Sequence, residues 1–391
     1  MRVLFVNENI GGHATVHHHL RLALGAHPEI EADFLDVPTP SLLRRLAGAR
    51  VPGLASLDLD LQPIRAQLAA SAWVRRAIGG RLGRYDVLHV YTQNAALLSQ
   101  SALRQVPSVI STDTTTTENA YRRPHRQPTR FTPITVSASK PFERRALGAA
   151  NIVVANSTWA RRNLVVEYQL APDRVRSQPL GITPPPIGPG PAPGTASHRP
   201  TIVFVGHQLE RKGGRQLLEL HQRHLAHRAD LVLITSEAVA PAPRVTVVND
   251  LVPGDDRLWP LLRRGAIFAF PSHIDQAPNA VLEAMAAGLP VVAMDTAALP
   301  EMVDHGRTGL LTDGGDRDLL AALTALIDDP SRRWAMGTAG RAHFEARYDA
   351  ARCTTNLVHI LREVGEASGG RPDRSSTDNS PTAPGSPASR W

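Results

Sequence analysis

Two segments of the chain open in the same way, and this limits the folds available to its 391 residues. Arg2–Asn7 and Thr201–Gly206 are each a nearly unbroken apolar run, followed by a glycine-bearing turn and a helical pattern. Such runs are typical of strands that are buried on both faces of a parallel sheet. Residues 184–200 between them are so rich in proline and glycine that they favour neither helix nor strand. The sequence therefore predicts two α/β domains joined by a linker.

The apolar pattern also predicts the extent of each domain. We expect a Rossmann-like domain over residues 1–183, the linker over 184–200 and a second Rossmann-like domain over 201–340, with a cleft where the carboxyl ends of the strands face each other. Residues 341–364 predict one amphipathic helix, and residues 365–391, rich in Ser, Pro and Gly, predict a disordered tail. Further strands are predicted at Val87–Tyr91, Ser108–Ser111, Ile152–Ala155, Leu231–Thr235, Val245–Val248, Ile267–Phe270 and Leu289–Met294. Helices are predicted at Val16–Leu24, Gln62–Ile78, Thr158–Tyr168, Gly214–His224 and Asp316–Ile327.

The stretch from Phe270 to Leu311 combines acids with a well-marked helix start. Asp275 and Glu283 lie on either side of Pro278, and proline suits the first position of a helix. Gly288 suits the residue just past its end, so a short helix is predicted over residues 278–287. The free N–H groups and positive dipole of its start favour a phosphate, and carboxylates accept hydrogen bonds from hydroxyls. This arrangement predicts a site for an anionic, hydroxyl-rich ligand such as a nucleotide sugar.

Two cations stand at the start of another predicted helix. Arg211 and Lys212 lie in Glu210–Gly214, which follows a buried strand and opens a helix, so they are well placed to neutralise a diphosphate. Because a departing diphosphate gains charge, these cations would act mainly in the transition state. Gly11 and Gly12, after the first strand, would let the backbone approach the same diphosphate from the other domain.

These motifs resemble the donor-site signature of the retaining family-4 glycosyltransferases of GT-B fold, also called glycosyl transferases group 1. Two positions depart from the family pattern. The first acid is Asp275 instead of Glu, which draws the carboxylate back and retunes its contacts with the donor sugar. His207 stands where many members carry Arg, so Arg211 is expected to supply the second cation. The matching residues are Pro278, Asn279, Glu283, the run Ala284–Val292, Glu301 and Gly306–Leu311.

The resemblance implies an α/β protein of GT-B fold, with two Rossmann-like domains facing across a cleft and a last helix crossing back to the first. It implies a metal-independent, retaining hexosyltransferase of the EC 2.4 class, without a tightly bound cofactor. The enzyme would move a sugar from a UDP- or GDP-sugar to a hydroxyl acceptor on a glycan, a lipid or a small molecule. Arg211 and Lys212 would hold the diphosphate, and Glu283 would hold the ribose hydroxyls. The sugar hydroxyls would contact Asp275 and the backbone of Gln276, Ala277, Pro278 and Asn279.

The acceptor side is less clearly marked. Asp113, within Ser111–Thr117, ends an apolar strand, and the resemblance puts it near the reacting centre, where it could orient or deprotonate the acceptor hydroxyl. Its alternative role is to cap a hydroxyl-rich turn. His89 either touches a ligand or is structural, and Glu301 either caps a helix or contacts a ligand. His17–His19 point in three directions on a helix, so they cannot share one metal ion.

Charge and composition limit the partners. Residues 1–183 hold 22 Lys and Arg against 13 Asp and Glu, whereas the remainder holds 21 against 23. The basic first half indicates an anionic partner, such as a membrane surface or a phosphate-bearing acceptor. Base composition of the genome explains it equally well, because only Lys140 and Lys212 among the 43 basic residues are lysines. Aromatic residues make up 5% and no nucleic-acid-binding motif occurs, so no nucleic acid is expected.

The sequence also predicts where in the cell the protein is found. Cys353 is the only cysteine, so no intrachain disulfide forms. No stretch resembles a signal peptide or a membrane-spanning helix. We expect a bacterial cytoplasmic protein, with peripheral contact to the inner face of the membrane as an open alternative.

Two other functions stay open. Asp275 and His207 are also compatible with a catalytically degenerate GT-B subunit that only binds nucleotide sugars. A GT-B nucleotide-sugar epimerase shares the same architecture. Turnover by the purified protein would separate these from a transferase.

Overall fold

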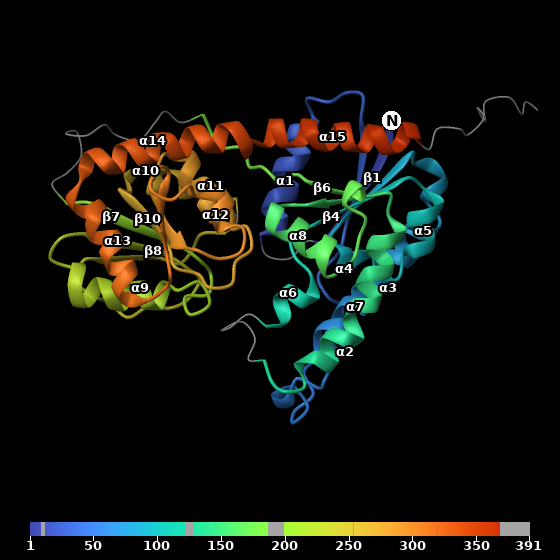
Figure 1. Ribbon diagram of the computed structural model, residues 1–391, viewed down its shortest axis with the longest axis horizontal. Helices are drawn as coiled ribbons and strands as arrows, with labels where there is room; N and C mark the ends of the chain where they lie inside the picture. Colours follow the sequence, from blue (N-terminus) through green and yellow to red (C-terminus); the bar gives the residue numbers. More distant parts are fainter. Residues whose placement is uncertain (9–11, 122–127, 187–198, 253, 368–391) are drawn as a thin grey trace, which may run out of the picture.

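A computed structural model of the chain describes residues 1–8, 12–121, 128–186, 199–252 and 254–367. These residues form two parallel six-stranded sheets that lie side by side along the long axis, each with helices on both faces (Figure 1). The strand order is β2-β1-β3-β4-β5-β6 in the first sheet and β12-β11-β10-β7-β8-β9 in the second. We call the two parts the first half and the second half.

The first sheet has its switch in strand order between β1 and β3. The chain steps from β1 outward to β2, then returns to β3 on the other side of β1 and continues to β6. In such doubly wound sheets ligands bind beside the carboxyl ends of the strands at the switch. The strands are β1 Arg2–Asn7, β2 Glu31–Asp36, β3 Val87–Tyr91, β4 Ser108–Thr112, β5 Ile152–Ala155 and β6 Val175–Ser177.

Alternate residues of β1 supply two apolar clusters on opposite faces of this sheet. Leu4 and Val6 join the larger cluster, whereas Val3 and Phe5 join a smaller one that includes residues of α1 and α15. This alternation follows from the two-residue period of a strand. The helices of the first half are α1 His13–Leu24, α2 Leu42–Ala47, α3 Gln62–Gly79, α4 Gln93–Ala96, α5 Gln100–Gln105, α6 Thr116–Ala120, α7 Thr132–Ala149 and α8 Thr158–Val166.

The second half is a doubly wound unit with its switch between β7 and β10. Both of these strands are buried along almost their whole length, as expected for the centre of a parallel sheet. The strands are β7 Thr201–Val205, β8 Asp230–Ile234, β9 Val245–Val248, β10 Ile267–Phe270, β11 Val291–Met294 and β12 Gly309–Thr312. The helices are α9 Gly214–Leu220, α10 Leu258–Arg264, α11 Asn279–Ala286, α12 Leu299–Met302, α13 Asp316–Asp328 and α14 Pro330–Arg347.

Three strands were not predicted from the sequence. β2 mixes exposed and half-buried positions at the edge of its sheet, so it lacks a continuous apolar run. β6 has only three residues, and β12 lies inside the Gly306–Leu311 motif. Short or half-exposed edge strands carry little hydrophobic signal.

The last helix of the chain returns to the first half. α15 (Ala350–Ala367) packs Leu357 and Leu361 into the cluster that contains Phe5 (Figure 1). The prediction of one helix over residues 341–364 is wrong, because α14 ends at Arg347 and a new helix begins at Ala350. The carboxylate of Asp349 accepts hydrogen bonds from the backbone N–H groups of Ala351 at 3.0 Å and Arg352 at 3.2 Å, and so caps α15.

The two segments that join the halves run side by side. The N–H of Ile182 donates to the carbonyl of Tyr348 at 3.1 Å, and the N–H of Ala350 donates to the carbonyl of Ile182 at 3.1 Å. Gly181 is required at this approach, since a Cβ there would lie 2.6 Å from the Cα of Ala350. None of the helices in the described part of the chain combines the length and apolarity that a bilayer crossing requires.

Candidate active site

A cleft separates the carboxyl ends of the two sheets. Its interior holds about 460 Å³ of space open to solvent, which is within the usual range for a site that binds a small molecule. From the first half it is lined by Gly12, His13, Tyr91, Asp113, Asn156 and Ser157, among others. From the second half it is lined by Gly206, His207, Arg211, Lys212, Asp275, Gln276, Ala277, Pro278, Asn279 and Glu283, among others. We call these two sets the acceptor wall and the donor wall, after the roles that the resemblance implies for them.

The donor wall brings the predicted cations and the first acid together. Gly213 has φ of 74°, and a Cβ there would lie 2.1 Å from the carbonyl oxygen of Pro271, so only glycine fits. This contact holds the turn that carries Arg211 and Lys212 against the end of β10. The Lys212 ammonium forms an ion pair with the carboxylate of Asp275.

Both carboxylate oxygens of Asp275 contact other residues of the second half. One carboxylate oxygen faces Lys212, with Arg211 Nη1 3.9 Å away, and the other accepts a hydrogen bond from Ser272 Oγ at 2.6 Å. Burial lowers the pKa of Lys212, and the charge of Asp275 opposes that shift. The sequence did not predict this direct contact between Asp275 and Lys212.

Helix α11 points its first turn into the cleft. It begins at Asn279, one residue later than predicted, because Pro278 keeps an extended conformation with ψ of 125°. Two side chains at this start reach across to the first half: Gln276 Nε2 donates to Asn119 Oδ1 at 2.6 Å, and Asn279 Nδ2 donates to the carbonyl of Gly12 at 3.0 Å. Glu283 follows in the second turn, where burial raises the pKa of its carboxyl to about 7.

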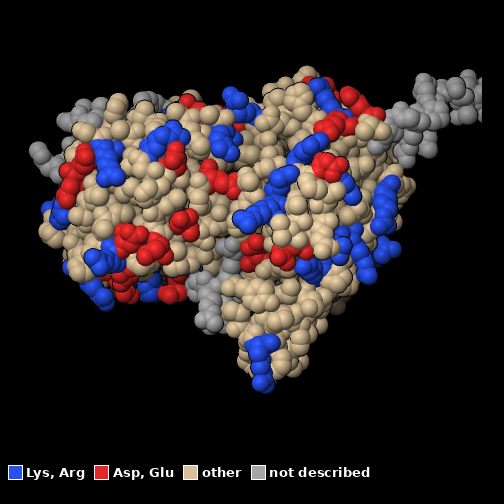
Figure 2. All heavy atoms as spheres, in the orientation of Figure 1, with Lys and Arg blue, Asp and Glu red and all other residues tan. Residues whose placement is uncertain are grey.

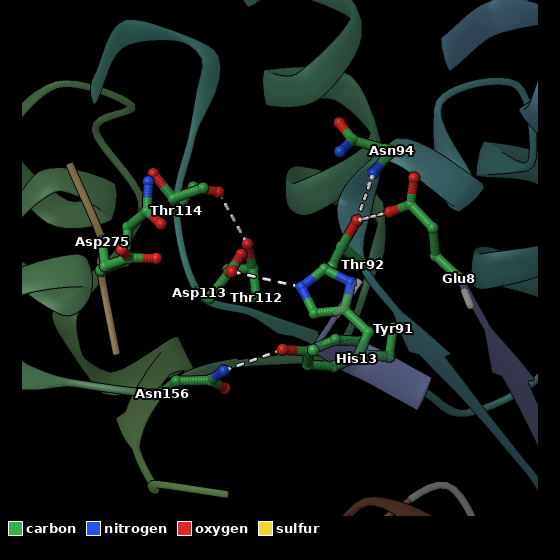
Figure 3. A network of polar contacts seen from close by, with 12 residues as sticks. Glu8, His13, Tyr91, Thr92, Asn94, Thr112, Asp113, Thr114, Asn156 and Asp275 are labelled. Atoms are coloured by element: carbon green, nitrogen blue, oxygen red, sulfur yellow. Dashed lines mark hydrogen bonds and ion pairs between the residues drawn. The ribbon is translucent and has the colours of Figure 1, made fainter. Parts of the chain in front are cut away.

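The acceptor wall centres on a histidine between two acids (Figure 3). His13 begins α1, and its Nε2 lies 3.3 Å from Oδ2 of Asp113, which follows β4. Behind it, the buried Glu8 accepts a hydrogen bond from the Thr92 hydroxyl. Burial opposes the protonation of His13, but the hydrogen bond and charge of Asp113, with the charge of Glu8, raise its pKa. Burial also raises the pKa of Glu8, against the effects of Thr92 and His13.

A tyrosine and an asparagine fix the orientation of this histidine. The ring of Tyr91 meets the ring of His13 edge-on, with 4.9 Å between centroids. The Tyr91 hydroxyl in turn accepts a hydrogen bond from Asn156 Nδ2 at 2.9 Å (Figure 3). Tyr91 is the last residue of β3 and Asn156 follows β5, so the wall gathers groups from four strand ends.

His13 and Glu8 were not predicted from the sequence. Glu8 follows β1 directly and His13 begins the next helix, so polar residues after a central strand were the available signal. The conspicuous histidines elsewhere are structural. His89 is buried with Nε2 2.8 Å from Ser111 Oγ, and burial lowers its pKa to about 4. Burial is also the main cause that lowers the pKa of His17, to about 3.

Glu301 caps a helix, which is one of the two roles predicted for it. Its carboxylate accepts hydrogen bonds from the N–H groups of Thr158 at 2.8 Å and Trp159 at 2.6 Å, so it caps α8 of the first half from the second half. Gly11 lies outside the described residues. Within the described ranges, no three His, Cys, Asp or Glu side chains are grouped so that they could hold a metal ion.

Each half of the chain matches a known protein family. Residues 10–184 match the family described as Glycosyltransferase Family 4, and residues 199–329 match the family described as Glycosyl transferases group 1. The chain belongs to the family-4 glycosyltransferases.

Two curated relatives show how far the sequence similarity extends. It is 31% identical over 255 residues to alpha-maltose-1-phosphate synthase from Mycolicibacterium smegmatis, covering 57% of this chain and 65% of the relative. It is 46% identical over 180 residues to a Corynebacterium glutamicum protein, over 42% of this chain and 47% of that one. That protein is named GDP-mannose-dependent monoacylated alpha-(1-6)-phosphatidylinositol monomannoside mannosyltransferase. The matched regions thus span about half to two thirds of these relatives.

The fold is GT-B, as the resemblance implied. A solved structure of sucrose-phosphate synthase from Thermosynechococcus elongatus superposes with a TM-score of 0.70 at 17% identity. The superposition covers 94% of this chain and 100% of that one. Both sheets are therefore those of the family-4 GT-B architecture.

Proposed function

We propose that the protein transfers a sugar from a nucleotide-diphosphate sugar to a hydroxyl acceptor, with retention at the anomeric carbon. One observation carries this proposal: the cations and helix start of the donor wall face the His13–Asp113 pair across one cleft. A diphosphate fits the first wall, and a hydroxyl that must lose a proton fits the second. The residues lie at the carboxyl ends of both sheets, where doubly wound folds bind ligands.

On the donor side, the chain's own groups bind and neutralise. Lys212 and Arg211 pair with the diphosphate, and the free N–H groups of α11 add the positive end of a helix dipole. The cations stabilise the charge that builds up as the sugar bond breaks. Glu283 accepts hydrogen bonds from the ribose hydroxyls, which requires its carboxyl to be ionised. Asp275 holds Lys212 in place and offers its carboxylate to the sugar hydroxyls.

On the acceptor side, the pair of His13 and Asp113 orients the incoming hydroxyl. Asp113 accepts the hydrogen bond of that hydroxyl, and His13, placed between Asp113 and Glu8, balances the two carboxylates. The departing phosphate helps to accept the proton on the same face of the sugar. This front-face route needs no protein nucleophile and leaves the anomeric configuration unchanged.

One relative suggests which nucleotide sugar the protein uses as donor. The Corynebacterium relative is named for GDP-mannose, and the donor wall described above suits a GDP- or UDP-sugar. The proposal includes a cytoplasmic protein that needs no tightly bound cofactor and no metal. Its acceptor reaches it from solution or from the inner face of the membrane.

The test is turnover by the purified full chain. The protein is incubated with UDP-, GDP-, ADP- and dTDP-sugars plus hydroxyl acceptors, and released nucleotide and glycoside are measured. We expect one nucleotide sugar to be consumed only when an acceptor is present, with a product of retained configuration. Tight nucleotide binding without glycoside formation would favour the degenerate binding subunit. Conversion of the donor sugar without an acceptor would favour an epimerase.

A further inference from the structure

Large apolar side chains gather on one short segment of the surface. Residues 41–57, which we call the tip, carry six exposed large apolar side chains. On α2, Leu42 and Leu43 are 73% and 78% exposed and Leu46 is 61% exposed. Large exposed apolar side chains gathered on one segment mark an interaction site. The other three side chains of the tip are Val51, Leu54 and Leu57.

The charge of the tip has one sign. Its charged residues are Arg44, Arg45 and Arg50, and it contains no Asp or Glu. The two acids that follow, Asp58 and Asp60, are buried. The protrusion that bears α2 shows blue and tan surface without red in the view of Figure 2. Apolar side chains interspersed with arginines are the composition that binds anionic lipid surfaces.

The tip is held rigidly from behind. Arg65 of α3 donates to the carbonyls of Ala47 at 2.8 Å and Ala49 at 2.6 Å, and Gln62 Nε2 donates to the carbonyl of Gly48 at 2.9 Å. Thr129 Oγ1 donates to the carbonyl of Leu57 at 2.8 Å. The backbone is therefore bonded to the domain while the apolar side chains stay outside. This distinguishes the tip from a loop whose side chains simply lack a place to pack.

The tip lies on the side of the first half that carries the acceptor wall. It follows the carboxyl end of β2, the edge of the sheet where Glu8 and His13 lie. Arg44 is near enough to Glu8 for that carboxylate to oppose the effect of burial, which lowers the pKa of Arg44. A surface bound at the tip would therefore lie beside the acceptor side of the cleft.

We propose that the tip docks on an anionic lipid bilayer and holds the acceptor wall next to the headgroups. A second copy of the chain fits less well, because a symmetric contact would set Arg44, Arg45 and Arg50 against themselves. Figure 1 shows α2 in the lower, narrow part of the first half, a shape that enters a deformable lipid interface more readily than it builds a broad protein contact. The docking itself does not rest on the proposed transferase function, so the two can fail separately.

The experiment measures binding of the full chain to vesicles by flotation. Vesicles of phosphatidylcholine with phosphatidylglycerol are compared with phosphatidylcholine alone. The test variant is Leu43→Ser/Leu46→Ser. The matched control is Leu22→Ser/Val166→Ser, whose side chains are 59% and 61% exposed away from the tip. We expect wild type and control to bind anionic vesicles, and the test variant to bind about tenfold less.

Charge is tested in the same assay with Arg45→Gln/Arg50→Gln. Its binding to anionic vesicles should fall several-fold, and wild-type binding should weaken as salt rises. Circular dichroism and the thermal midpoint confirm that each variant is folded. The proposal is overturned if wild type does not float with anionic vesicles, or if the test variant floats as well as the control. It is equally overturned if wild type is a dimer that Leu43→Ser/Leu46→Ser converts to a monomer.

Discussion

The donor wall and the acceptor wall are built in different ways. The donor wall takes its second acid, helix start and Asp275 from one continuous stretch, with the two cations on a single turn beside it. The acceptor wall takes one or two residues from each of four strand ends, and two of them that are in contact, His13 and Asp113, are 100 residues apart in the sequence. A motif can describe the first wall, whereas only the folded sheet assembles the second.

This difference separates two duties of the enzyme that we propose. The donor wall must always bind the same diphosphate and ribose, which a fixed local motif can do. The acceptor wall must suit one acceptor, and residues at separate strand ends can change independently. Each of the following experiments either breaks this division or makes it sharper.

The largest effect is expected from Lys212→Gln. The amide still donates to Asp275, but the charge that stabilises the departing diphosphate is lost, so kcat should fall about 100- to 1000-fold. The measurement is nucleotide release at saturating donor and acceptor. Lys140→Gln is the control, since Lys140 does not line the cleft and pairs instead with Glu167 at 3.4 Å and with the ring of Tyr168. Equal rates in the two variants would remove Lys212 from the site.

His13→Asn and Asp113→Asn test the acceptor wall. Each removes one partner of the 3.3 Å contact, and kcat should fall about 100-fold because the acceptor hydroxyl is no longer oriented or relieved of its proton. His18→Asn is a matched control on the exposed side of α1. Initial rates at varied acceptor concentration give kcat and KM separately. Normal kinetics in both test variants would show that the reaction does not use this pair.

Glu283→Gln tests the buried acid through pH. The pKa of Glu283 is about 7 in the folded chain against 4.5 for an exposed glutamate, so the folded state holds this proton more tightly. Wild-type stability from this group is therefore intact below about pH 4.5 and is lost as pH rises towards 7. The variant should gain about 3 kcal/mol over wild type at pH 8 and nothing at pH 4.

Urea unfolding at several pH values measures this difference directly. Nucleotide titrations add a second readout: wild-type affinity should rise between pH 6 and pH 8 as Glu283 ionises, while that of Glu283→Gln stays flat. A stability difference that is independent of pH would contradict the burial of this carboxyl.

The smallest effect concerns the contact between the halves. Glu301→Gln weakens the cap that this side chain places on α8, so unfolding free energy should fall by about 1 kcal/mol. Glu345→Gln removes an exposed pair with Arg341 and should change it by about 0.3 kcal/mol or less. Indistinguishable unfolding curves would show that Glu301 does not join the halves in solution.

Sequence and structure agree best where the signal is local. The buried parallel strands β1, β3, β5 and β10 occur where the apolar runs predicted them, because a strand covered on both faces must be apolar along its length. The donor motif was recognisable for a similar reason, since its residues are neighbours in sequence and in space. The start of α11 at Asn279 was missed by only one residue.

The features that were not predicted from the sequence depend on the folded structure and not on a local pattern. Glu8 and His13 are ordinary residues in the sequence, and only the packing of β1 between β2 and β3 brings them to Asp113. The break between α14 and α15 depends on the cap formed by Asp349, which the helical period does not reveal. The pairing of Asp275 with Lys212 likewise arises from the turn at Gly213. This turn packs the segment after β7 against the end of β10, which is distant from it in the sequence.

One titration tests the central claim most directly, namely that the two walls of one cleft divide donor and acceptor between them. The nucleotide that wild type binds is titrated into wild type, Lys212→Gln and Asp113→Asn by calorimetry. The division predicts that the Kd weakens about tenfold or more for Lys212→Gln and stays within about twofold of wild type for Asp113→Asn. Equal weakening in both variants, or none in Lys212→Gln, would contradict it.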